Sequence, residues 1–201
     1  MDLTPDVLLD AYRGGIFPMA DSRDGPIYWY APDPRAVLPL HAFCVSRNLE
    51  RLVKRRPFEV RVDTAFEAVM RACAGRQDTW ISEDIIESYV GLHEIGFAHS
   101  VECWKGDQLV GGLYGVSIGG AFFGESMFHR VTDASKVALV HLVQALRDAG
   151  FVLLDTQFLT PHLARFGVIE IPREAYEKEL AQAIGLPVSF PKTMVSGASQ
   201  D

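Results

Sequence analysis

The strand predicted at residues 151–154 ends in Asp155-Thr156-Gln157, which places two polar side chains at the end of an apolar segment. Asp155 and Gln157 are two residues apart, and side chains at this spacing on a strand point to the same side. A carboxylate beside an amide could accept a proton from one reactant and orient another. The competing interpretation is that Asp155 caps a loop, and the residues alone favour it.

A glycine-rich segment over residues 111–128 (GGLYGVSIGGAFFGESMF) would form a wall beside this strand end. Its pattern predicts two strands joined by a turn at residues 118–120. Six glycines lie among the aromatic side chains. Because glycine weakens a strand, that density requires either bulges or a ligand close to the backbone. A bulged sheet without a ligand and the wall of a cleft are about equally supported.

The elements around these segments predict an α+β fold, with a sheet that is antiparallel over its first strands. Residues 16–39 contain five prolines and are predicted to be a loop without regular structure. Further strands are predicted at 58–62, 98–104, 108–116, 151–156 and 168–171. Helices are predicted at 133–149, 161–165 and 173–184, and after the N-cap residues Thr4, Ser46, Asp63 and Ser82.

The composition is that of an ordinary soluble protein, with 48% apolar and 22% charged residues. A net charge of −7 is the wrong sign for a protein that coats nucleic acid, although a local basic patch would still allow binding. Three scattered cysteines without a CxxC pair predict reduced thiols in the cytoplasm. No apolar run reaches the ~18 residues of a membrane span, and the N-terminus does not have the pattern of a signal peptide.

A basic face is predicted on the helix after Ser46. Its members recur at spacings of three and four residues: Arg47, Arg51, Lys54 and Arg55, with Arg56 next in line. Such a face is usually a solvated surface. Five cations within ten residues, offset only by Glu50, also fit an edge that binds phosphate groups in an otherwise acidic chain.

Motifs for covalent, metal or cofactor chemistry are missing from the sequence. His93-Glu94 lacks the second histidine of a zinc-protease HExxH helix, because Phe97 stands at that position. Gly124-Glu125-Ser126 lacks the second glycine of a nucleophile elbow. No Walker A or GxGxxG sequence occurs. We therefore expect no metal and no cofactor, and a reaction of an already activated substrate.

The sequence resembles the bacterial leucyl/phenylalanyl-tRNA–protein transferases over nearly its whole length. The resemblance is carried by motifs in order along the chain: YRGGIFP, WYAPDPRAVLP, TWI, AHSVECW, LVGGLYGV, FFGESMF, ASKVAL, DTQ, HLARFG and IPREAY. Members transfer Leu or Phe, and sometimes Met, from aminoacyl-tRNA to the α-amine of a protein that begins with Arg or Lys. The new residue marks that protein for degradation through the N-end rule. The resemblance also implies a small N-terminal domain and an acyltransferase fold like that of the acetyl-CoA-dependent N-acetyltransferases.

The resemblance further implies roles for individual residues. Asp155 and Gln157 match the family's proposed catalytic pair: Asp155 would accept a hydrogen bond or proton from the incoming α-amine, and Gln157 would orient that amine or the ester carbonyl. Glu125 matches a residue that contacts the substrates. The apolar pocket for the Leu or Phe side chain would consist of Leu113, Phe122 and Leu142.

The resemblance also implies contacts with tRNA. Trp80 matches a tryptophan placed near the terminal adenosine, where an aromatic ring can stack on a base. Met19 stands where many relatives have a second tryptophan, so stacking there would be weakened or taken over by Trp29 or Tyr30. The basic face corresponds to the family's contact region for the acceptor stem.

We expect three parts in the chain: a small N-terminal helix-plus-loop domain (1–34), an acyltransferase-like catalytic domain (35–188) and a flexible tail (189–201). The expected partners are Leu- or Phe-charged tRNA and acceptor proteins with N-terminal Arg or Lys, with no membrane. We expect a cytoplasmic monomer.

Two other functions stay open. One is an acetyl-CoA-dependent N-acetyltransferase, although no Q/R-x-x-G-x-G/A turn precedes the helix at 133–149. The other is a non-catalytic module that binds aminoacyl-tRNA or a peptide in the same cleft.

Overall fold

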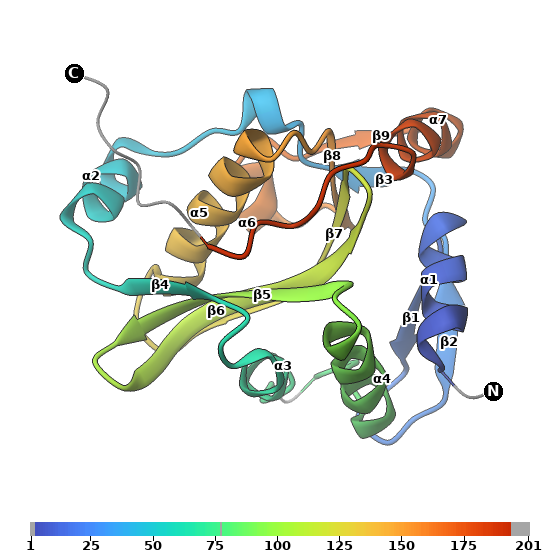
Figure 1. Cartoon of the computed structure of the whole chain (residues 1–201), viewed down its shortest axis with the longest axis horizontal. Coiled ribbons are helices and arrows are strands. Elements are labelled where there is room, and N and C mark those ends of the chain that lie inside the picture. Colours follow the sequence, from blue (N-terminus) through green and yellow to red (C-terminus); the bar gives the residue numbers. More distant parts are fainter. Residues whose placement is uncertain (1–2, 77, 194–201) are drawn as a thin grey trace.

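The computed structural model describes residues 3–76 and 78–193, and a seven-stranded sheet lies at the centre of this part of the chain (Figure 1). The strand order is β4-β5-β6-β7-β8-β3-β9. Neighbouring strands are antiparallel except β7 and β8, which are parallel. The bounds are β3 Arg35–Val37, β4 Glu59–Val62, β5 Ala98–Lys105, β6 Gln108–Ile118, β7 Ala121–His129, β8 Leu153–Gln157 and β9 Ile169–Ile171.

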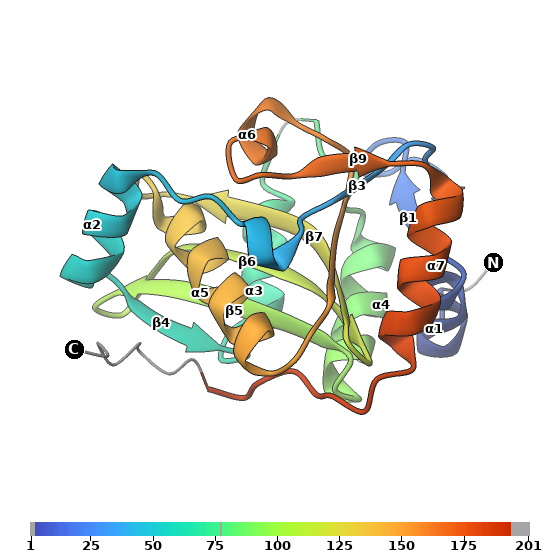
Figure 2. The same cartoon turned by 90° about the horizontal axis from the view of Figure 1, so that it is seen from above.

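Helices cover both faces of the sheet (Figures 1 and 2). α5 (Ala134–Asp148) crosses one face and links the parallel strands β7 and β8, as a parallel connection requires. α2 (Arg47–Arg55) lies on the same side, whereas α3 (Phe66–Cys73) and α4 (Glu83–Glu94) cover the opposite face. The buried side chains form two hydrophobic clusters. The predicted α+β class, a mixed sheet flanked by helices, is confirmed.

The N-terminal segment contains more regular structure than predicted. α1 (Pro5–Arg13) is followed by β1 (Phe17–Ala20) and β2 (Ile27–Tyr30), which form a separate two-stranded sheet, and then by β3. The prediction of a structureless loop over 16–39 is therefore wrong. Pro18 is tolerated in β1 because a strand with a single neighbour leaves one row of its backbone groups without ladder bonds.

Three predicted N-caps are confirmed, because each side-chain oxygen accepts a backbone N–H three residues later: Thr4, Ser46 and Ser82. The fourth prediction is wrong. Asp63 adopts a left-handed backbone (φ 58°) and accepts the N–H of Ser100, while α3 begins only at Phe66. The buried Glu102 carboxylate instead accepts two N–H groups just before α3, those of Thr64 and Ala65.

Close packing accounts for most glycines of the β6–β7 hairpin, whose turn at Gly119-Gly120 was predicted. A Cβ at Gly115 would lie 2.2 Å from the Phe123 carbonyl oxygen, next to a register shift between the strands. A Cβ at Gly111 would lie 2.5 Å from the Cβ of Ala134 in α5. The hairpin therefore needs glycine chiefly where its two strands approach each other closely and where α5 packs against it.

After α6 (Pro161–Ala164), α7 (Arg173–Ile184) lies beside α1 at one end of the sheet (Figure 2). Part of the predicted tail continues the core: Phe190 is 7% exposed and stacks on Phe122 with 5.3 Å between ring centroids. Residues 194–201 of that tail lie outside the described residues. None of the described helices is long and apolar enough to cross a membrane.

Candidate active site

A cavity of about 600 Å³ opens between the β6–β7 hairpin, the end of β8 and α5. Six residues singled out in the sequence line it: Met19, Trp80, Leu113, Glu125, Leu142 and Gln157. Six leucines contribute to its lining: Leu38, Leu113, Leu139, Leu142, Leu154 and Leu163. Gly124 is the one hairpin glycine in that lining. Residues distant in the sequence thus form one hollow with an apolar wall and a polar end.

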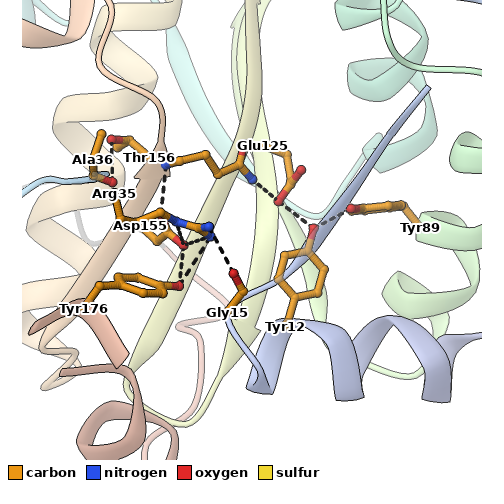
Figure 3. Close-up of polar contacts among 10 residues, drawn as sticks. Tyr12, Gly15, Arg35, Ala36, Tyr89, Glu125, Asp155, Thr156 and Tyr176 are labelled. Carbon is orange, nitrogen blue, oxygen red and sulfur yellow. Dashed lines mark hydrogen bonds and ion pairs between the residues drawn. The ribbon is translucent and has the colours of Figure 1, made fainter. Parts of the chain in front are cut away.

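Asp155 does not line this cavity, because its carboxylate is held in a buried ion pair with Arg35 (Figure 3). The Arg35 guanidinium donates from Nε to Oδ1 at 3.0 Å and from Nη2 to Oδ2 at 2.6 Å. Both side chains are almost fully buried, at 1% and 0% exposure. Tyr176 donates its hydroxyl to Oδ2 at 2.7 Å, and the backbone N–H of Gln157 donates to Oδ1 at 2.8 Å. Asp155 is therefore fully engaged by protein groups.

The Arg35 side chain also ties the N-terminal segment to the site. Its Nη1 donates to the carbonyl oxygen of Gly15 at 3.0 Å. The guanidinium lies over the rings of Phe17 and Tyr176, 4.7 and 4.6 Å from their centroids. Such stacking suits the weakly hydrated guanidinium better than an ammonium.

The Asp155 and Gln157 side chains do not share a direction, in contrast to the prediction from strand spacing. Gln157 has a left-handed backbone (φ 65°), which ends the strand alternation. Its amide Nε2 donates to Oε1 of Glu125 at 2.8 Å, while the Asp155 carboxylate lies against Arg35. Gln157 therefore reaches the cavity and Asp155 supports the strand end beneath it.

Glu125 is the carboxylate that lines the cavity at this end. It is 9% exposed, and its Oε1 accepts the Tyr12 hydroxyl at 2.6 Å in addition to the Gln157 amide. Its Oε2 is buried and has no hydrogen-bond partner among the described residues. Burial raises the pKa of Glu125 to about 8, an effect that the negative charge of Asp155 reinforces and the Tyr12 hydrogen bond opposes.

A chain of hydrogen bonds runs from Glu125 through the Tyr12 hydroxyl to Tyr89 (Figure 3). Tyr114 lines the cavity, and its buried hydroxyl has no partner among the described residues. Burial, followed by the Glu125 charge, raises the pKa of all three phenols well above the ordinary value. These hydroxyls therefore stay protonated at neutral pH and can donate to a carboxylate.

Several predicted residues lie elsewhere. Phe122 belongs to the same hydrophobic cluster as Leu113 and Leu142 but stays outside the cavity lining, because its ring stacks on Phe190. Trp29 and Tyr30, the suggested substitutes beside Met19, do not line the cavity either. The basic face of α2 is exposed along its whole length: Arg47, Arg51, Lys54 and Arg55, with Arg56 following the helix.

Other site residues carried no clear signal in the sequence. Phe158 follows Gln157 directly, lines the cavity and leaves 43% of its surface exposed. Arg35 and Tyr12 lie within the quoted motifs WYAPDPRAVLP and YRGGIFP, yet only the fold shows their partners. Within residues 3–76 and 78–193, no three His, Cys, Asp or Glu side chains could jointly hold a metal ion, and the absence of a cofactor stays a prediction.

Similar solved structures are distant. The chain matches L-PGS from Bacillus licheniformis with a TM-score of 0.43 and 13% identity, over 79% of this chain and 55% of that one. It matches a GCN5-related N-acetyltransferase-like protein from Streptococcus suis with a TM-score of 0.38 and 16% identity, over 83% and 63%. Similarities at this level have no bearing on activity.

Sequence comparison is far more specific. The family model for leucyl/phenylalanyl-tRNA protein transferase matches residues 37–181, and the model for its N-terminal domain matches residues 1–33. The transferase of Salinibacter ruber is 60% identical over 91% of this chain and 81% of its own length. That of Gloeobacter violaceus is 57% identical over 94% and 97%. The chain therefore belongs to the leucyl/phenylalanyl-tRNA protein transferase family.

Proposed function

We propose that this protein transfers Leu or Phe from aminoacyl-tRNA to the N-terminal α-amine of proteins that begin with Arg or Lys. The supporting observation is a cavity with a leucine-lined wall and a polar end formed by Glu125 and Gln157, in a chain of this transferase family. The donor side chain would occupy the apolar wall, and the amine would approach the ester beside the polar end. Such an addition would mark acceptor proteins for N-end rule degradation.

The reaction needs positioning more than covalent catalysis, because an aminoacyl ester is already activated. The acceptor nitrogen forms a bond to the ester carbonyl carbon, and the bond from that carbon to the ribose oxygen breaks. The nitrogen must lose a proton and the ribose oxygen must gain one. A carboxyl group near the nitrogen can carry out this exchange.

Glu125 suits that task better than Asp155. An N-terminal ammonium has a pKa of about 8, and the pKa of Glu125 is also raised to about 8. A proton therefore passes between them with little change in free energy. The unpartnered Oε2 of Glu125 would receive this proton, and the Gln157 amide would hold Oε1 in place.

Asp155 would act indirectly, as a residue that positions Gln157. Its ion pair with Arg35 and its bond to the Gln157 N–H hold the end of β8, from which Gln157 reaches Glu125. This role replaces the direct proton acceptance expected from the sequence.

The tRNA would lie across the exposed basic face of α2, and its terminal adenosine would enter beside Trp80. Phe158, an exposed ring on the same cavity, would offer the second aromatic surface that Met19 does not provide. We further propose that the protein acts in the cytoplasm as a monomer.

A transfer assay with three donors tests this function. The wild-type protein is incubated with an acceptor protein that begins with Arg, together with labelled leucyl-tRNA, phenylalanyl-tRNA or acetyl-CoA. Transfer from the two charged tRNAs and not from acetyl-CoA is the expected result. Acetyl transfer would support the N-acetyltransferase alternative, whereas tightly bound leucyl-tRNA without product would favour a binding module.

A further inference from the structure

Two of the quoted motifs contain nitrogen-bearing side chains that have no role so far, and the fold brings these side chains to the same cavity. Lys136 lies in ASKVAL, in the first turn of α5, and His162 lies in HLARFG, in α6. Both line the cavity, as does His129 at the end of β7. Three elements that are separate in sequence therefore contribute nitrogen-bearing side chains to the lining of one cavity.

These groups are close enough to influence one another. Burial lowers the pKa of His162, and the positive charges of Lys136, Arg165 and His129 lower it further. Among the described residues, the one carboxylate paired with this cluster is Asp133, whose Oδ1 lies 2.6 Å from Nζ of Lys136. An ammonium has three N–H donors, so this pair leaves donors of Lys136 for a ligand.

The position of this cluster along α5 indicates what it would bind. Lys136, Leu139 and Leu142 line the cavity at helical spacing, so the lining changes from cationic to apolar along one face of the helix. Lys136 and Leu142 are six residues apart, a rise of about 9 Å. A charged aminoacyl-adenosine has the same order of groups: an apolar side chain, an ester, a ribose and then a phosphate.

We propose that Lys136 and His162, with His129 beside them, bind the phosphate group on the 5′ side of the terminal adenosine of the donor tRNA. This inference rests on the proposed function and adds a subsite to it. The apolar wall would bind the amino-acid side chain, and the cationic cluster would bind the phosphate of the nucleotide that carries it. A phosphate accepts hydrogen bonds from both an ammonium and a neutral imidazole N–H.

A binding measurement tests the subsite without requiring transfer. Calorimetry compares adenosine 5′-monophosphate with adenosine for the wild type, Lys136→Met, Lys136→Arg and Lys178→Gln. The wild type should bind the phosphorylated nucleoside at least about tenfold more tightly, a difference of about 1.4 kcal/mol. This preference should fall to about twofold in Lys136→Met and persist in Lys136→Arg. Lys178→Gln is the control, because Lys178 is an exposed α7 cation outside the cavity lining.

A second comparison uses the leucyl esters of the same two nucleosides as donors for an Arg-starting peptide. The phosphate should lower the KM of the wild type, and Lys136→Met should lose most of this advantage. The proposed subsite would be contradicted by equal affinity of the wild type for adenosine and adenosine 5′-monophosphate. It would also be contradicted if Lys136→Met kept the preference of the wild type for the phosphorylated ligand. A phosphate preference in binding without transfer from either ester would instead support the subsite and contradict the proposed transferase activity.

Discussion

Glu125 is the residue whose surroundings depart furthest from those of an ordinary carboxylate. It is buried, its Oε1 accepts two hydrogen bonds and its Oε2 accepts none from the described residues. Burial, reinforced by the negative charge of Asp155, outweighs the positive charge of Arg35 and favours the protonated form of this carboxyl group. Its proton therefore links the stability of the protein to pH in a way that can be measured without substrate.

The first prediction concerns this linkage. The pKa of Glu125 is 4.5 in an ordinary setting and about 8 in the folded protein. Between these values the folded protein keeps a proton that the unfolded chain has lost, so the unfolding free energy falls as pH rises. Relative to Glu125→Gln, the wild type should lose up to about 1.4 kcal/mol per pH unit between pH 5 and 7.5.

Urea unfolding at a series of pH values measures this difference. Glu174→Gln, a change at a highly exposed α7 carboxylate, serves as the control and should follow the wild type throughout. Parallel pH profiles for the wild type and Glu125→Gln would contradict the raised pKa.

The second prediction concerns the Arg35–Asp155 ion pair. Asp155→Asn leaves the buried Arg35 charge without its counter-charge, which should cost about 3–5 kcal/mol of unfolding free energy. Replacing both partners, Arg35→Met with Asp155→Leu, should restore much of the stability, because an apolar pair of similar volume avoids the buried charge.

Transfer activity separates the positioning role from mere stability. The double variant should stay inactive even where it is folded, since Gln157 has lost the carboxylate that accepts its N–H. Full activity in the restored double variant would show that Asp155 has no part in arranging the site.

At the scale of elements, the β6–β7 hairpin shows where sequence patterns are informative and where they stop. Its strands and turn could be predicted from alternation and from Gly119-Gly120. The purpose of the glycines could not, because their neighbours come from other elements: Ala134 of α5 lies against Gly111. A pattern along one segment does not reveal which distant atoms lie against it.

The third prediction follows from this packing. Gly115→Ala would place a Cβ 2.2 Å from the Phe123 carbonyl oxygen, so it should destabilise the protein by at least about 2 kcal/mol. Gly91→Ala, in α4, is the matched change. Its Cβ would lie 3.5 Å from the Pro5 side chain, which is an ordinary contact distance. Because glycine in the interior of a helix is unfavourable, this substitution should raise the free energy of unfolding by about 0.5–1 kcal/mol. Equal effects of the two substitutions on the urea midpoint would contradict this account.

At the scale of the whole molecule, the exposed basic face of α2 and the cavity occupy different regions, as expected for an enzyme that holds a large donor by one part and reacts at another. The net charge of −7 makes this division important. An acidic protein can bind a phosphate backbone only where cations are locally concentrated.

The fourth prediction tests this division. Arg47→Gln, Arg51→Gln and Lys54→Gln combined should weaken leucyl-tRNA binding, and the slope of log affinity against log salt should fall by about 2. The rate of transfer should fall with leucyl-tRNA as the donor. It should not change with the leucyl ester of adenosine, which is too small to reach α2. The control is the pair Arg173→Gln and Lys178→Gln on α7, which should leave the salt slope unchanged.

The fold class and most elements could be predicted from local patterns, since periodicity, caps and turns lie within a few residues of one another. The short strands β1, β2 and β3 could not, because proline-rich segments form strands only when a partner is present. The same limit applies to the site. Asp155 and Gln157 could be singled out by position. Arg35, the buried partner that holds Asp155 beneath Gln157, lies 120 residues from Asp155 in the sequence.

The most direct test of the whole account is single-turnover transfer of labelled leucine from leucyl-tRNA to an Arg-starting protein, with Asp-starting and Glu-starting proteins as parallel acceptors. The wild type should label the Arg acceptor alone. Glu125→Gln should bind leucyl-tRNA equally well and transfer at least about 100-fold more slowly, the usual effect of removing a proton acceptor. Equal rates for the two proteins, or no labelled acceptor with the wild type, would contradict the account.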